Sequence, residues 1–296
     1  MRETPKLLDQ IQESVLQTSE TRRTQSRPKR LPPVALVTPV QLLGIVAISN
    51  HKAWDDMEIV QRQARSFNPE TQARTSWLAK ATEFQEWFRA ERSSLLLADG
   101  CITDHSGLVT PMSGFCATLI SSLMESKHNT VLFFFAGEHC KLDSPDHRGN
   151  GPNSLIGSLI SQLLACSALA EPDLTFLSRE YLEDLENYEL EALYDLFDNL
   201  MQQLPPTSEL YCIIDGISWY EQQRWLYDLE RVAAMSEHVV RRQRKNPRKL
   251  IPLKLLMTSS GKSIELVKRS RDSGSVWKHV SLAAGQAIPG VPRFGV

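Results

Sequence analysis

Short apolar runs alternate with longer segments of helical periodicity along the chain from Ser93 onward. The five apolar runs are Ser94–Ala98, Thr130–Ala136, Glu209–Ile214, Lys254–Ser259 and Val276–Leu282. Between them, apolar residues recur at helical spacing in Met112–Ser126, Ser154–Ala168, Leu190–Gln203 and Gln222–Arg242. Near-continuous apolar strands separated by helices are typical of a parallel sheet that is buried on both faces. The pattern therefore predicts an α/β fold with a three-layer, doubly wound parallel sheet.

The segment before the first strand has a different character. Residues 1–32 are polar with a basic cluster around Pro28, which predicts a flexible arm. Helical periodicity at Trp54–Arg65 and Gln72–Arg89 predicts a helical N-terminal extension. We therefore expect four parts, namely an arm at 1–32, the extension at 33–92, the sheet domain at 93–285 and a tail at 286–296.

Charge and composition indicate which partners and which cellular compartment to expect. Lys and Arg number 33 against 35 Asp and Glu, so the net charge of −2 gives no general attraction to nucleic acid or to an anionic membrane. The apolar stretch Leu31–Ser49 contains Pro32, Pro33 and Pro39, so it predicts a packed helix or strand rather than a membrane span. The 5 widely spaced cysteines predict free thiols in a reducing compartment. We expect a cytoplasmic protein, and the basic cluster leaves the nucleus open as the alternative.

The first apolar run leads into a loop with some features of a phosphate-binding loop. Such a loop needs glycines for close backbone approach, a helix N-terminus, and a Lys and a Ser or Thr at its end. Part of this set is supplied by the candidate nucleotide-binding residues Gly100, Gly107, Thr110 and Ser113. The lysine is missing, because no Lys or Arg lies between Arg92 and Lys127. An ordinary strand-to-helix loop with two glycines explains the same residues.

The third apolar run ends in a carboxylate, Asp215. An acid at this position in a P-loop fold holds Mg²⁺ through water, so Asp215 is our candidate metal-site residue. The alternative is that Asp215 caps the turn at Gly216, which Asp does well.

An ordered set of segments surrounds these two motifs. It comprises the helix with Gln85-Glu86-Trp87-Phe88, the glycine loop, Val131–Gly137, Gly151–Leu164, Tyr211–Ile217 and Leu253–Ser259. From Ala81 to Leu282 this series resembles the NACHT-type signalling NTPases of the STAND class, in the form common in fungal proteins with a nephrocystin-like N-terminal domain. The resemblance implies a sheet of the P-loop NTPase type. It also places Gly100–Ser113 at the family's Walker A motif, Asp215 at its Walker B acid and Leu255–Ser259 at its sensor strand.

Carried over by position, the resemblance implies loss of catalysis. The Walker A lysine has no counterpart, Ser218 and Trp219 stand where further acids usually follow, and Ser260 stands where an arginine is common. Phosphoryl transfer depends on such positioned charges. We therefore expect a pseudo-NTPase that acts as a signalling or scaffold domain through protein partners or self-association. It would bind ATP, ADP or GTP with Mg²⁺ weakly or not at all, and nucleic acid is not an expected partner.

Two other functions stay open. An active NTPase switch would need a replacement cation, for which Arg148 and Lys262 are candidates, with Glu221 orienting the water. An unrelated α/β enzyme is the third possibility, because fold does not fix function.

Three further features are given structural interpretations. The His, Cys and acidic residues at 138–147 have no standard zinc spacing and predict a solvated loop. Gly261-Lys262-Ser263 lacks the leading glycine of a Walker A motif and predicts an ordinary strand-to-helix turn. The basic residues at 241–249 predict a solvated helix end.

Overall fold

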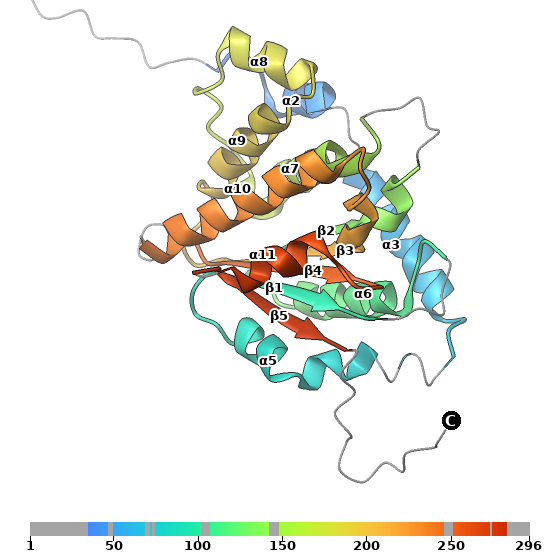
Figure 1. Cartoon of the computed structure of the whole chain (residues 1–296). Helices are drawn as coiled ribbons and strands as arrows, with labels where there is room; N and C mark the ends of the chain where they lie inside the picture. Colours follow the sequence, from blue (N-terminus) through green and yellow to red (C-terminus); the bar gives the residue numbers. More distant parts are fainter. Residues whose placement is uncertain are drawn as a thin grey trace, which may run out of the picture. The chain divides into compact units, whose positions relative to one another are not determined.

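Five parallel strands form the central sheet of the computed structural model, which describes residues 35–46, 50–68, 72, 75–101, 107–141, 148–245, 251–272 and 274–282 (Figure 1). In chain order the strands are β1 (Ser94–Asp99), β2 (Asn129–Phe135), β3 (Glu209–Asp215), β4 (Leu253–Ser259) and β5 (Trp277–Ser281). Their order across the sheet is β2-β3-β4-β1-β5, and every neighbouring pair is parallel. All five strands lie within two residues of the predicted runs. The predicted arm at 1–32 and tail at 286–296 lie outside the described residues.

Helices cover both faces of the sheet (Figure 1). One face carries α3 (Asn50–Ala64), α5 (Thr82–Phe88) and α6 (Pro111–Met124). The other face carries α7 (Gly151–Leu164), α10 (Leu226–Lys245) and α11 (Glu265–Arg271). Against this second group lie α2 (Pro39–Val46), α8 (Arg179–Glu186) and α9 (Leu190–Met201). Short 3₁₀ turns complete the set at η1 (Leu78–Lys80), η2 (Ala136–His139), η3 (Ser167–Leu169) and η4 (Ile217–Tyr220).

The apolar runs of the sequence explain this layering. Successive residues of a strand point to opposite faces, so a strand between two helical layers must be apolar at every position. In β1, Leu95 and Leu97 join the core beneath α7 and α10, while Leu96 and Ala98 join the core beneath α5 and α6. The same alternation holds in β2, β3 and β4. The α/β class and the three-layer, P-loop-like arrangement are thereby confirmed.

The prediction of one helix over Gln72–Arg89 is wrong. The described residues are helical at 72 and 75–76, then form η1 and α5, and Ala81 between these two elements adopts an extended backbone with φ −65° and ψ 137°. Leu78, Phe84 and Trp87 are nevertheless all buried. Two short pieces can therefore satisfy an apolar spacing that reads as one helix. The stretch Leu31–Ser49 contributes α2, whose Leu42 and Val46 pack into the core. Among the helices that the structure describes, none has the length and apolar character needed to cross a bilayer.

Candidate functional site

The carboxyl ends of β1, β3 and β4 meet at one edge of the sheet, where ligands bind in open α/β folds. The parallel register places Asp99 beside Ser259 and Ile214 beside Met257. The polar residues that end these three strands are therefore neighbours, although they are far apart in the sequence. This edge is also where the helix α6 begins after the glycine loop.

Side chains of the same segment cap the backbone N–H groups at the start of α6. Thr110 is the N-cap residue and Pro111 follows it, two residue types that favour the first positions of a helix. The backbone N–H of Ser113 donates to Thr110 Oγ1 over 3.3 Å, and the N–H of Thr110 donates to Ser113 Oγ over 3.0 Å. Both residues are buried. The structure thus brings these two predicted nucleotide-binding residues together, but in a capping box that uses their hydroxyl groups.

The two candidate glycines have different surroundings. A Cβ atom on Gly100 would lie 2.9 Å from the carbonyl oxygen of Ser260 and 3.1 Å from that of Ser259. The Gly100 N–H also donates to Ser259 O over 2.7 Å. Glycine is therefore needed at position 100 because of the close approach of the backbone at the end of β4, which explains this residue without a ligand. Gly107 would place a Cβ no closer than 3.4 Å to a neighbour, and loop residues 102–106 lie outside the described part of the chain.

Asp215 is 4% exposed and its carboxyl group lies in an internal network. Thr258 Oγ1 donates to Asp215 Oδ1 over 2.6 Å, and Cys116 Sγ lies 3.8 Å from the same oxygen. Burial raises the pKa of Asp215, while hydrogen bonds from Ser113, Thr258, Cys116 and the Gly216 N–H oppose the rise. All four of these partners are uncharged. A carboxyl group that burial pushes toward its neutral form is a poor ligand for Mg²⁺ or its water.

Cys116 shares the same environment from the core side of α6. Its thiol also lies 3.7 Å from Thr258 Oγ1. Burial and the charge of Asp215 raise the pKa of this thiol well above its usual value, so it stays protonated and can act as a donor. Thr258 and Cys116 were not among the predicted site residues. The signal that could have found Thr258 is the parallel register, which brings the end of β4 to the end of β3. Cys116 reaches the same place through the packing of α6 on β3, which the sequence does not show.

Glu221 is engaged at the start of α11. Its carboxylate accepts hydrogen bonds from Ser263 Oγ and from three backbone N–H groups, those of Ile264, Glu265 and Leu266. Free N–H groups at a helix start are commonly satisfied by such an acid. The role of Glu221 as a water-orienting acid stays a prediction, since this geometry accounts for the residue without it.

The two candidate replacement cations lie in different settings. Arg148 donates to the carbonyl oxygen of Glu186 over 2.8 Å, and its guanidinium lies 5.8 Å from the centre of the Tyr188 ring. Lys262 has an exposed side chain. The carbonyl oxygen of the preceding residue, Gly261, accepts a hydrogen bond from the Cys101 N–H over 3.1 Å. The backbone next to Lys262 is therefore bonded to the start of the glycine loop.

A buried hydrogen-bonded pair of Asp56 and His139, which the sequence did not reveal, joins α3 to η2. His139 Nε2 lies 2.7 Å from Asp56 Oδ2, and His139 Nδ1 lies 2.8 Å from the carbonyl oxygen of Gly149. Lys52 Nζ donates to the other Asp56 oxygen over 2.8 Å. Burial alone would raise the pKa of Asp56, but the hydrogen bonds and charges of His139 and Lys52 outweigh it and hold this pKa below its usual range.

This pairing also changes the interpretation of the His-rich and acidic segment at 138–147. His139 is a buried structural residue rather than part of a solvated loop. Asp143, Asp146 and His147 lie outside the described residues. Within the described ranges, no group of three or more His, Cys, Asp or Glu side chains is arranged to hold a metal ion.

Comparison with known proteins gives one family. The model of the nephrocystin 3, N-terminal family matches residues 74–260, which is more than half of the 296-residue chain. No curated protein and no solved structure matches the chain significantly. The matched segment runs from the residues before η1 to the end of β4, and it includes Gly100, Ser113 and Asp215. The chain therefore belongs to the nephrocystin 3, N-terminal family.

Proposed function

We propose that this chain is a pseudo-NTPase, a P-loop-like domain that acts by contacting other proteins rather than by hydrolysing nucleotide. The observation that carries the proposal is the closed network around Asp215. The groups that would hold Mg²⁺ and phosphate in a working site bond to one another instead, with Ser113 capping α6 and Thr258 donating to Asp215.

The chemistry of phosphoryl transfer supports this proposal. The reaction requires cations and a metal ion that neutralise charge on the transferred group, and an acid that positions the nucleophile. No Lys or Arg occurs in the chain between Arg92 and Lys127, so the loop brings no cation of its own. The next acidic residue after Asp215 in the sequence is Glu221, and its carboxylate accepts four hydrogen bonds at the start of α11. The cation and the acid that positions the nucleophile would therefore have to come from residues other than those that the family resemblance implies.

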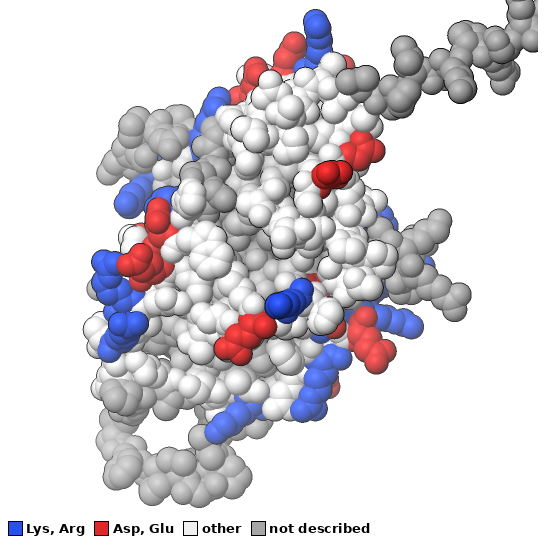
Figure 2. Space-filling view, turned by 180° about the vertical axis from the view of Figure 1, so that it is seen from behind, with Lys and Arg blue, Asp and Glu red and all other residues white. Residues whose placement is uncertain are grey.

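The charge distribution on one face of the molecule favours protein partners over nucleic acid. On the face drawn in Figure 2, Lys and Arg side chains stand beside Asp and Glu side chains around the rim, and uncharged side chains cover most of the centre. Nucleic-acid binding needs a continuous basic surface. We place the domain in the cytoplasm, since widely spaced free cysteines suit a reducing compartment.

A phosphate-release assay tests the proposal. The purified chain is incubated with Mg-ATP and with Mg-GTP, alongside the Asp215→Ala variant. We expect no turnover above the buffer blank for either protein. Turnover by the natural chain that Asp215→Ala abolishes would contradict the proposal.

A second candidate is an active switch in which Lys262 replaces the missing lysine. Lys262 is favoured over Arg148 for this role because its neighbour Gly261 hydrogen-bonds to Cys101 at the start of the glycine loop. Arg148 instead contacts the Glu186 carbonyl oxygen and the Tyr188 ring. In the same assay this candidate predicts turnover that falls by about 100-fold or more in Lys262→Ala, the scale for loss of one charge-stabilising group. Exposed Lys268, which pairs with Glu265, provides a control position.

A further inference from the structure

The strand β2 forms one edge of the sheet, and among the described residues it pairs on one side alone, with β3. Along a strand, the backbone groups of successive residues point alternately to the two sides. The carbonyl oxygen of His128 accepts the Glu209 N–H at the start of β3 over 3.0 Å. By this alternation the backbone groups of Val131 and Phe133 point away from β3. An edge of this kind is a template on which a further strand can pair.

A side-chain amide takes the place of such a strand beside Phe133. The Phe133 N–H donates to Gln162 Oε1 over 3.0 Å, and Gln162 Nε2 donates to the Phe133 carbonyl oxygen over 2.8 Å. These are the two bonds that a residue exchanges with its opposite in an antiparallel pair of strands. Gln162 Nε2 also donates to the hydroxyl group of Ser158, one turn earlier in α7, over 3.2 Å, which fixes the amide in position. Gln162 therefore imitates one residue of a neighbouring strand.

The rest of this edge has little protection of its own. The N–H and C=O of Val131 have no hydrogen-bond partner among the described residues, and its side chain is partly exposed. Proteins commonly protect an edge strand with charged residues or proline. The opposite edge strand, β5, carries Lys278 and His279, whereas β2 has neither a charged residue nor proline. The protection of β2 therefore depends on Gln162.

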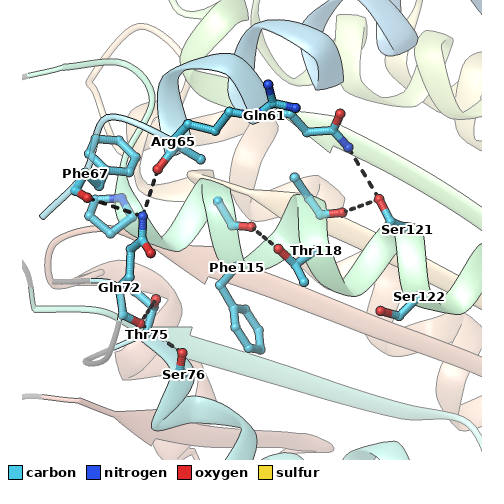
Figure 3. Close-up of a pocket in the computed structure, with 14 residues that line it drawn as sticks. Gln61, Arg65, Phe67, Gln72, Thr75, Ser76, Phe115, Thr118, Ser121 and Ser122 are labelled. Atoms are coloured by element: carbon cyan, nitrogen blue, oxygen red, sulfur yellow. Dashed lines mark hydrogen bonds between the residues drawn. The ribbon is translucent and has the colours of Figure 1, made fainter. Parts of the chain in front are cut away.

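An exposed aromatic side chain lies next to the same edge. Trp54 of α3 meets the Phe133 ring edge-on, with the ring centres 5.4 Å apart, and it is 51% exposed. Figure 3 shows how α3 is held on this face of the sheet, where Gln61, further along the helix, donates to Ser121 of α6 over 3.3 Å. A half-exposed Trp beside an unpaired strand edge is typical of a surface that binds protein.

We propose that the outer edge of β2 is a self-association surface, which Gln162 covers in the single chain and which pairs with β2 of a second copy when the amide moves away. A second copy fits because an uncharged strand can pair antiparallel with itself about a twofold axis. Phe133 would then exchange both backbone bonds with Phe133 of the second copy, so its bonds to Gln162 are replaced. This inference does not depend on whether the chain hydrolyses nucleotide.

Sedimentation velocity of the purified full chain at increasing concentration tests the proposal. Gln162→Leu removes both amide bonds and keeps the approximate size of the side chain, and Gln162→Asn shortens the amide by one methylene group. Gln203→Leu is the matched control. Gln203 makes the same pair of bonds to the N–H and C=O of Asp173, over 2.7 and 3.0 Å, but Asp173 is not in a strand.

A double variant tests whether the association uses the backbone of β2. Adding Val131→Pro to Gln162→Leu removes an N–H that points out of the sheet and leaves the bonds to β3 in place. Circular dichroism and thermal unfolding verify that each variant is folded.

We expect Gln162→Leu to form a reversible dimer with an association constant about tenfold to a hundredfold above those of the natural chain and of Gln203→Leu. The reason is that two hydrogen bonds no longer compete with strand pairing. Gln162→Asn should change in the same direction, and Val131→Pro should return Gln162→Leu to the monomer. Amide exchange at positions 131 and 133 should slow in the dimer.

Three results would overturn the proposal. The first is that folded Gln162→Leu and Gln162→Asn associate no more than the natural chain. The second is that Gln203→Leu associates as strongly as Gln162→Leu, because loss of stability alone would then explain the effect. The third is a dimer of Gln162→Leu that Val131→Pro leaves intact.

Discussion

Gly137 of η2, two residues after β2, packs against the carbonyl oxygen of Leu108, the residue that precedes the start of α6 by three positions. A Cβ atom at position 137 would lie 2.3 Å from that oxygen, which is closer than any real contact. We expect Gly137→Ala to lower the free energy of unfolding by about 1–3 kcal/mol, the range for overpacking a core. Urea unfolding of the two proteins measures the difference.

Gly44 of α2 is the matched control for this substitution. No atom lies within 4 Å of the position that a Cβ on Gly44 would take. Gly44→Ala should therefore stabilise the protein by about 0.5–1 kcal/mol, because alanine favours a helix interior over glycine. Equal effects at the two glycines would contradict the packing at Gly137.

Asp56 gives a prediction for pH dependence. Its folded pKa is lowered relative to its ordinary value, so its contribution to stability is present above about pH 4 and disappears as the pH falls through the lower folded pKa. We expect Asp56→Asn to cost about 3 kcal/mol at pH 7, the scale for removing one member of a buried ion pair. The difference from the natural chain should shrink in urea titrations below pH 4.

The neighbouring Asp55 is exposed and serves as the control for this experiment. Asp55→Asn should change the free energy of unfolding by less than about 0.5 kcal/mol at pH 7. A cost for Asp56→Asn that stays constant from pH 7 to pH 3 would show that its contribution is not that of an ionised carboxylate.

At the scale of elements, the start of α11 depends on Glu221. This carboxylate accepts three backbone N–H groups at the first turn of a seven-residue helix, which is too short to be stable alone. Glu221→Gln should lower the free energy of unfolding by about 1 kcal/mol and speed amide hydrogen exchange at positions 264–266. Exposed Glu230 of α10 is the control, and Glu230→Gln should leave both quantities unchanged. Unaltered exchange in Glu221→Gln would contradict the cap.

The elements were more predictable from the sequence than the site was. A strand that is buried on both faces is mostly apolar, so β1 to β4 appear in the sequence as apolar runs. The edge strand β5 is partly exposed and includes Lys278 and His279. The break at Ala81 could not be predicted, because two short elements preserve the apolar spacing of one long helix. The link between Asp56 and His139 spans 83 residues, so only the tertiary fold creates it. Asp215 was found by its place at a strand end, but its closure by Thr258 and Cys116 depends on sheet register.

At the scale of the whole molecule, the sheet has a P-loop-like arrangement, and the described polar groups of Asp215, Thr258 and Cys116 at its carboxyl edge hydrogen-bond to one another. The strand order brings Asp215, Thr258 and the start of α6 together. Filling this edge with internal hydrogen bonds stabilises the fold without a ligand, because buried polar groups must find partners. The domain would then be a rigid platform whose outer surfaces carry its function.

Titration calorimetry of the purified chain with Mg-ADP and Mg-ATP, with Asp215→Ala as the companion variant, tests this account most directly. The closed network predicts no binding with a dissociation constant below about a millimolar for either nucleotide, and no difference between the two proteins. Micromolar binding to the natural chain that Asp215→Ala abolishes would show that the edge opens to hold nucleotide, and would contradict the account.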